Sequence, residues 1–322
     1  MATKVPSLFK IGQAIKGRFG TYIITKEYQA GVWAAKNSLK ETVVVKSVAD
    51  HPRVENERDN LRRFQEQTPC IRPILDEVVN TSIPTTIILK HLDTTLLDAS
   101  IKRNLNRKEL KYVSRRVLEA IQVLHADGYV HTADIKPDNV FINYGQGDLR
   151  FANVQLGDLG GSYPMDSKWA KEGTPVGAPM WSSPEIIMER PWNTATDIWS
   201  FGAMLISLIY GGNFCLFRPR TVSYDHEEYG LEVLKRQFQY FGPFEKEYLE
   251  IASPEVVQAI FWLMQEVPAA TMTQFHRTTE REVCQSDKDF IGKIMKLDWR
   301  QRPTAKELLE DEWWMEPEES RP

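Results

Sequence analysis

The spacing of hydrophobic residues changes near residue 91, and this change constrains the fold more than any other feature. Before it, β-branched runs at 21–25, 41–48 and 85–92 are separated by polar turns, which predicts strands. One helical segment, 53–65, lies among them. After residue 91, apolar residues recur every three or four positions, which is typical of helices. We therefore predict an α+β fold: a small antiparallel β lobe with one helix, then a larger, mainly helical lobe.

The helices of the second part carry recognisable ends. Asn106 can cap a helix over 106–127, with Glu109 three residues on. Thr304 and Glu307 predict a capping box at the start of the last helix. Further helices are expected at 194–210, 231–239, 254–266, 287–297 and 304–314. We divide the chain into an N-terminal ATP-binding lobe, a C-terminal catalytic and substrate lobe, and a frayed tail, at 9–90, 91–315 and 316–322.

Composition narrows the class of protein. The net charge of −4 over 322 residues provides no basic field for nucleic acid. Three cysteines, an odd and sparse count, indicate a reducing compartment. The most hydrophobic stretch, 201–217, is interrupted by Gly211 and Gly212, so it predicts a buried helix rather than a membrane span. We expect an intracellular monomer, cytoplasmic or nuclear, that binds neither nucleic acid nor membranes.

The segment HTADIKPDN, 131–139, carries the strongest chemical signal. Asp134 is followed by Lys136 at plus two and Asn139 at plus five. Phosphoryl transfer needs a carboxylate to orient the attacking hydroxyl, a cation near the moving phosphate and an oxygen ligand for Mg²⁺. A short loop can present all three at one point. The alternative interpretation is a polar turn shaped by proline and asparagine.

This segment resembles the catalytic loop H-R-D-L-K-x-x-N of eukaryotic-type Ser/Thr protein kinases. The other signatures of that family follow in order: DLG at 158–160, GAPMWSSPE at 177–185, DIWSFG at 197–202 and RPTAKELL at 302–309. The resemblance implies the bilobal kinase fold and a buried pair between Glu185 and Arg302. The DLG variant is similar to that of a divergent SR-protein-kinase-like branch.

The resemblance implies a role for each motif residue, with ATP and Mg²⁺ as cofactors. Asp134 would deprotonate the substrate hydroxyl, and Lys136 would stabilise the transferring phosphate. Asn139 and Asp158 would hold Mg²⁺. Asp197 would anchor the backbone of the catalytic loop.

In the first lobe, the VVVK run places Lys46 on a strand, where it would contact the nucleotide phosphates. Its partner would be Glu57, with Glu55 as the alternative. GRFG, from Gly17 to Gly20, resembles the second half of the phosphate-covering loop.

The segment between the two lobes is expected to hold the adenosine part of the nucleotide. Backbone groups of Lys90 and Leu92 would contact the adenine. Asp93 would reach the ribose.

The chain departs from the family pattern in three places. His131 lies three residues before Asp134 instead of two, so the loop bulges or Thr132 takes the histidine position. Ala133 replaces the arginine that binds an activation-loop phosphate. We therefore predict that phosphorylation of the loop does not switch the protein on. Ala178 replaces a threonine that bridges the catalytic Asp and Lys.

These observations favour a protein kinase that transfers the γ-phosphate of MgATP to Ser/Thr hydroxyls of a protein substrate. The departures motivate an alternative: a pseudokinase that keeps the fold and binds ATP or acts as a scaffold, with little or no phosphotransfer. A small-molecule phosphotransferase also uses D-x-x-x-x-N, but Lys136, the S-P-E element and Arg302 resemble protein kinases instead.

Overall fold

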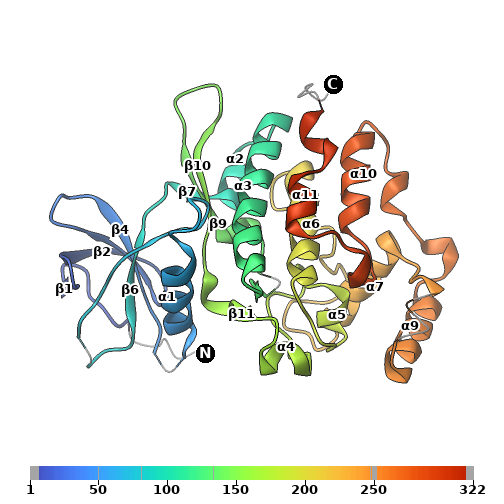
Figure 1. Cartoon of the computed structure of the whole chain (residues 1–322), viewed down its shortest axis with the longest axis horizontal. Coiled ribbons are helices and arrows are strands. Elements are labelled where there is room, and N and C mark those ends of the chain that lie inside the picture. Colours follow the sequence, from blue (N-terminus) through green and yellow to red (C-terminus); the bar gives the residue numbers. More distant parts are fainter. Residues whose placement is uncertain are drawn as a thin grey trace.

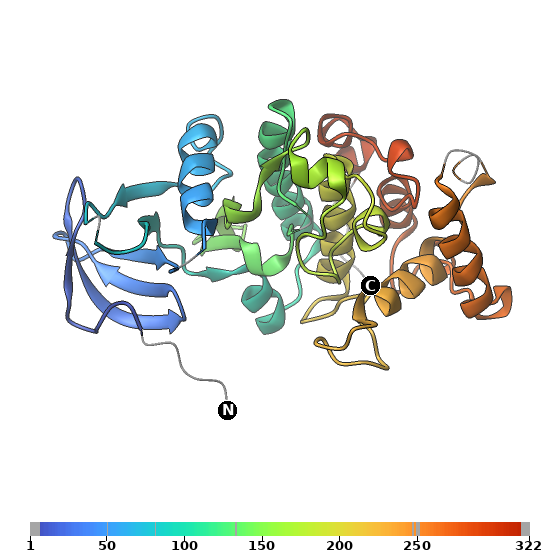
Figure 2. The same cartoon turned by 90° about the horizontal axis from the view of Figure 1, so that it is seen from below.

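The computed structural model describes residues 7–49, 51–80, 82–132, 134–246, 248 and 252–316. A curled antiparallel sheet with one helix lies beside a larger helical part, so the fold is the bilobal α+β fold that the sequence predicts (Figure 1, Figure 2). The sheet has the order β1-β2-β3-β4-β6-β5. Its strands are β1 (Ala14–Lys16), β2 (Thr21–Gln29), β3 (Val32–Lys36), β4 (Thr42–Ser47), β5 (Ile74–Glu77) and β6 (Thr86–Lys90).

Alternating side chains make the core of this sheet. Ile24, Trp33, Val43, Val45 and Ile88 are buried in one cluster, as expected for β-branched and aromatic residues on one face of a pleated sheet. The sheet also curls back on itself, because the end of β1 bonds to the residues that follow β5.

Two small sheets lie where the two lobes meet (Figure 1). Their strands are β7 (Thr94–Thr95), β9 (Val140–Tyr144) and β10 (Phe151–Leu156) in one sheet, and β8 (Tyr129–Val130) and β11 (Tyr163–Pro164) in the other. Short 3₁₀ helices lie between and after these strands. They are η1 (Pro137–Asn139), η2 (Leu159–Gly161), η3 (Ala269–Thr271), η4 (Phe275–Arg277), η5 (Trp299–Gln301) and η6 (Glu312–Met315).

Helices lie over the periodic segments of the sequence, but the one predicted over 287–297 begins at Gln285 and ends at Ile294. They are α1 (Arg53–Phe64), α2 (Leu96–Lys102), α3 (Arg107–Ala126), α4 (Lys168–Glu172), α5 (Pro184–Ile187), α6 (Ala195–Tyr210), α7 (Tyr229–Phe241), α9 (Pro254–Glu266), α10 (Gln285–Ile294) and α11 (Ala305–Leu309). The capping boxes at Asn106 and Thr304 are confirmed. Among the helices in the described ranges, none is both long and apolar enough to cross a membrane.

A buried ion pair fixes the larger lobe. The Nη1 and Nη2 atoms of Arg302 lie 2.7 and 2.8 Å from the two carboxylate oxygens of Glu185, so the predicted pair is confirmed. Arg302 also donates to the carbonyl groups of Lys296 and Ala195, which leaves few of its N–H groups unsatisfied. This geometry ties the start of α5 to the segment before α11.

The C-terminal prediction needs two corrections. The expected helix over 304–314 ends at Leu309, and η6 follows separately, because the side chain of Asp311 accepts the Trp313 N–H and caps a new turn. Glu316 was expected in the frayed tail, yet Arg107 and Lys111 donate hydrogen bonds to it. Residues 317–322 lie outside the described residues.

Candidate active site

Lys46 lies on β4, directly between Val32 of β3 and Ile87 of β6. Its Nζ atom lies 2.6 Å from Glu57 Oε2 and 2.8 Å from Asp158 Oδ1. The choice of Glu57 as its partner is therefore confirmed, whereas Glu55 accepts a bond from Thr85. Burial would lower the pKa of Lys46, but the two carboxylates outweigh burial and raise it. The ammonium is held in its charged form.

One face of α1 points at the segment around Asp158. Glu57 lies one turn after Arg53, where the helix begins, which accounts for the short separation between Lys46 and Glu57. Asn60 donates to the carbonyl oxygens of Leu159 and Ser162, at 2.9 and 3.0 Å. Asn56 donates to those of Gly160 and Ser162. The spacing of three and four residues places these polar side chains on one side of the helix.

The catalytic-loop residues bond to one another. Lys136 Nζ lies 2.6 Å from Asp134 Oδ1, and Asn139 Nδ2 lies 2.8 Å from Asp134 Oδ2. Asn139 also donates to the Asp134 carbonyl, which holds the end of η1 against the loop. Because Lys136 reaches Asp134 directly, the threonine missing at Ala178 leaves no gap between them.

His131 and Thr132 define the course of the chain before Asp134. The backbone N–H of His131 bonds to Asp197 Oδ2 at 2.6 Å, and its Nε2 atom lies 3.2 Å from the Gly157 carbonyl oxygen. The predicted anchoring by Asp197 is confirmed. Thr132 has a left-handed φ of 64°, and its hydroxyl donates to the carbonyls of His131 and Gly161. The chain therefore turns sharply at Thr132. Ala133 lies outside the described residues.

Asp158 stands between two cations. It follows β10 with a left-handed φ of 56°, a conformation that few non-glycine residues adopt. Lys46 contacts its Oδ1 atom, and Arg53 Nη2 lies 3.0 Å from its Oδ2 atom. Burial would raise the pKa of Asp158, but Lys46 and Arg53 outweigh burial and lower the pKa well below its usual range.

Arg53 is the residue that the sequence interpretation missed. The same Nη2 atom lies 3.5 Å from Asp134 Oδ2, so one guanidinium contacts both carboxylates. No motif of the family resemblance gave this position a role. Only its place one turn before Glu57, on the same face of α1, could have indicated it.

The predicted mechanistic residues thus form one connected network. Glu57 bonds to Lys46, Lys46 to Asp158, and Arg53 links Asp158 to Asp134. Asp134 in turn contacts the two remaining members, Lys136 and Asn139.

The assignment of Gly17 and Gly20 to the phosphate-covering loop is wrong. The turn between them bonds to Asp76 of β5, whose carboxylate accepts the backbone N–H groups of Arg18 and Phe19 at 3.0 Å each. A side chain at Gly17 would collide with that carboxylate. The N–H groups that would meet a phosphate already have an anion. The hairpin beside Lys46 is instead β2–β3, which turns at Ala30 and Gly31.

The segment after β6 retains its predicted place next to the sheet, but some of its groups are already bonded. The Lys90 N–H donates to Pro73, and its carbonyl accepts Arg72 Nε at 2.8 Å. The Asp93 carboxylate accepts the Tyr144 N–H at 2.9 Å. Leu92 is buried. A carbonyl oxygen has two lone pairs, so Lys90 keeps one acceptor position. Burial lowers the pKa of Arg72 to about 10.

Comparison with known proteins gives a consistent result. A family model described as protein kinase domain matches residues 9–314. The chain is 32% identical to the serine/threonine-protein kinase shk1/pak1 of Schizosaccharomyces pombe over 36% of this chain and 17% of that protein. It is 26% identical to a calcium/calmodulin-dependent protein kinase type 1 of Macrobrachium nipponense, over 81% of this chain and 61% of that protein. The chain thus spans less than two thirds of either relative.

Proposed function

This chain belongs to the protein kinase family, and we propose that it transfers the γ-phosphate of ATP to serine or threonine hydroxyls of a protein substrate. One observation supports the proposal: the contacts of Lys46, Glu57 and Asp158 and those of Asp134, Lys136 and Asn139 form a single network across both lobes, because Arg53 joins Asp158 to Asp134. We also propose 9–90 and 91–315 as the two functional lobes.

Each side chain has a proposed role. Asp134 orients the attacking hydroxyl and accepts its proton at a carboxylate oxygen. Lys136, beside it, stabilises charge on the transferring phosphate. Lys46 binds the α- and β-phosphates of ATP, and the ion pair with Glu57 positions Lys46. The backbone of Lys90 and Leu92 is proposed to hold the adenine.

The donor set fits magnesium. Mg²⁺ prefers carboxylate and amide oxygens, and Asp158 and Asn139 offer one of each. The Nδ2 atom of Asn139 donates to Asp134, which leaves its amide oxygen as the free end of the side chain. When bound, the metal neutralises charge on the phosphates.

A second candidate, a pseudokinase that binds nucleotide without efficient transfer, is favoured by two contacts. Arg53 Nη2 already contacts one carboxylate oxygen of Asp134 and one of Asp158.

Transfer from radiolabelled ATP separates the two candidates. The purified protein is incubated with Mg²⁺, ATP and a pool of Ser/Thr peptides. We expect transfer by the parent and its loss, by about 100-fold or more, in Asp134→Asn, because the base is removed. The exposed Asp148→Asn serves as the control. ATP binding without transfer in the parent would identify a pseudokinase.

A further inference from the structure

Arg53 brings a positive charge into the nucleotide site from the first turn of α1. Its Nη2 atom lies 3.0 Å from Asp158 Oδ2 and 3.5 Å from Asp134 Oδ2. Lys46 contacts the other oxygen of Asp158. Both oxygens of that carboxylate therefore already face a cation from the chain itself.

Packing and hydrogen bonds around α1 determine the position of Arg53. A side chain at Gly160 would lie 2.5 Å from Arg53 Cγ and 2.8 Å from its carbonyl oxygen, so the glycine leaves the space that the arginine stem fills. Asn56 and Asn60, on the same face of α1, bind the backbone of residues 159–162. The helix that carries Arg53 and the segment that carries Asp158 are thus held together.

The charges of the network balance. Its carboxylates are Glu57, Asp134 and Asp158, and its cations are Lys46, Lys136 and Arg53. Without Arg53, the carboxylates would exceed the cations by one, and Asp134 and Asp158 would repel each other. A divalent cation is the usual remedy for such repulsion.

We propose that Arg53 supplies to Asp158 the positive charge that a divalent cation would otherwise supply, so that this chain binds ATP without a divalent cation. This inference rests on the proposed function, because it concerns the same nucleotide site. The guanidinium fork can also contact a phosphate oxygen while it stays beside the carboxylates.

Binding of a fluorescent ATP analogue, measured in EDTA and in MgCl₂, tests the inference. We expect the parent to bind with affinities that differ by less than about threefold between the two conditions. In Arg53→Ala, binding in EDTA weakens at least about tenfold, while MgCl₂ restores it. Arg53→Lys keeps the positive charge, so its affinity in EDTA should lie between those of the parent and Arg53→Ala. Arg58→Ala is the matched control, because Arg58 lies on the same helix and pairs with Asp59.

The possible failures are distinguishable. A parent that binds the analogue only in MgCl₂ overturns the role of Arg53 and leaves the proposed function intact. If the parent binds the analogue in neither condition, the chain has no nucleotide site and the proposed function is wrong as well. Since the parent decides both outcomes, poor folding of Arg53→Ala does not prevent the test.

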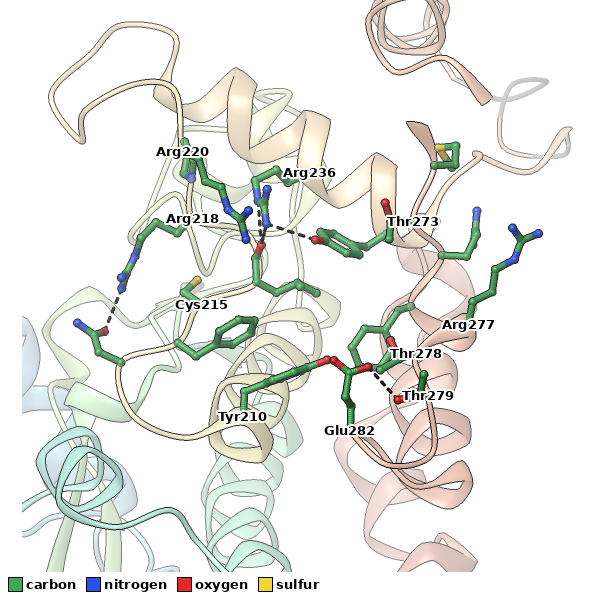
Figure 3. Close-up of a pocket in the computed structure, with 18 residues that line it drawn as sticks. Tyr210, Cys215, Arg218, Arg220, Arg236, Thr273, Arg277, Thr278, Thr279 and Glu282 are labelled. Carbon is green, nitrogen blue, oxygen red and sulfur yellow. Dashed lines mark hydrogen bonds between the residues drawn. The ribbon is translucent and has the colours of Figure 1, made fainter. Parts of the chain in front are cut away.

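A second, independent observation concerns a hollow of about 580 Å³ in the larger lobe (Figure 3). It lies between the end of α6, the loop that follows, α7 and the region of η4. Arg218, Arg220 and Arg236 line one side of it, and in Figure 3 the Arg218 side chain points away from those of Arg220 and Arg236. Phe214 and Phe275 contribute aromatic surface.

These three arginines have no acidic partner among the described residues. Arg218 donates to the Asn213 side chain, and Arg236 donates to the Leu216 carbonyl at 2.8 and 2.6 Å. The acidic residue of the hollow, Glu282, accepts a bond from Thr279 and lies away from the arginines in Figure 3. Arg218 and Arg220 are exposed, and positive charges that line a hollow without an acidic partner favour a bound anion.

We infer that this hollow binds a phosphoserine or phosphothreonine side chain of a partner protein. A phosphate carries a charge of about −1.5 to −2 and three acceptor oxygens, which suits several guanidinium groups better than a carboxylate does. The aromatic surface would contact an apolar residue next to the phosphorylated one.

Fluorescence anisotropy of a labelled peptide, with one phosphoserine flanked by phenylalanines, tests this site. We expect binding at least about tenfold tighter than for the same peptide with serine, and loss of that preference in Arg220→Glu. The exposed Arg281→Glu is the control. Inorganic phosphate at equal concentration should not displace the peptide. Equal binding of both peptides, equal binding by both variants, or displacement by free phosphate would overturn the inference.

Discussion

At the scale of single residues, the site depends on how carboxylates are neutralised. Asp158 adopts a left-handed backbone conformation and keeps its charge because Lys46 and Arg53 each contact one of its oxygens. Lys46 also contacts the buried Glu57, but there burial outweighs the lysine and raises the pKa of the carboxyl group. Unpaired charges in such a place would be costly, so the cations are as important to folding as to chemistry.

The lowered pKa of Asp158 predicts a dependence of stability on pH. A carboxyl group whose pKa falls on folding stabilises the protein above its unfolded pKa, about 3.9, and loses that contribution as the pH drops further. We therefore expect the stability difference between the parent and Asp158→Asn to be constant from about pH 5 to 7 and to narrow below about pH 4. Urea unfolding across this range measures it. A difference that stays constant to about pH 2.5 would contradict the assignment.

At the scale of elements, α1 and the segment 159–162 behave as one unit. The side chains of Asn56 and Asn60 donate to the backbone carbonyls of Leu159, Gly160 and Ser162. The resulting contact holds Glu57 at Lys46 and Arg53 at Asp158 without any phosphate group. Hydrogen bonds and ion pairs within the chain thus position α1, and none of them involves a phosphate group.

Replacement of Asn60 by Ala should weaken this unit. The change removes two hydrogen bonds, at a cost of about 1–3 kcal/mol in total, while the Leu159 carbonyl keeps the Ser162 N–H and the Ser162 carbonyl keeps Asn56. We expect a lower midpoint of thermal unfolding and faster amide exchange in residues 159–162. Asp59→Ala, on the exposed side of α1, is the control and should change neither quantity.

Loop phosphorylation should be dispensable for the same reason. We expect a variant with Ser162→Ala, Tyr163→Phe, Ser167→Ala and Thr174→Ala to retain the radiolabel transfer of the parent within about threefold. Ser162 is buried, so it is also a poor target for modification. Abolished transfer in a folded variant would contradict this expectation.

At the scale of the whole molecule, long-range ion pairs join distant parts of the larger lobe. Glu185 and Arg302 are separated by 117 positions, and both are buried. The bonds of Arg302 to Glu185 and to the Ala195 carbonyl position α5, the segment before α11 and the start of α6 relative to one another.

Glu185→Gln leaves the guanidinium of Arg302 buried without its counter-charge. We expect a loss of about 3–5 kcal/mol in the free energy of unfolding, measured with guanidinium chloride. The exposed Glu310→Gln should lose less than about 0.5 kcal/mol. Similar values for the two variants would show that the pair contributes little to stability.

The sequence by itself determined the elements and the short-range chemistry. Periodicity located α3, α6 and α9 because a helix repeats every 3.6 residues, and caps such as Asn106 act within three residues. Asp134, Lys136 and Asn139 could be identified together because a few residues of chain fix their spacing.

Only the tertiary structure decided which distant groups meet. Arg53 contacts Asp134 across 81 positions and Asp158 across 105, and Asp76 reaches the turn at Arg18 across 58. Such pairs depend on how the sheet curls and how α1 packs, which no local pattern records. The prediction for Gly17 and Gly20 was wrong for the same reason. A pair of glycines predicts a turn, but it does not predict that the Asp76 carboxylate binds the N–H groups of that turn.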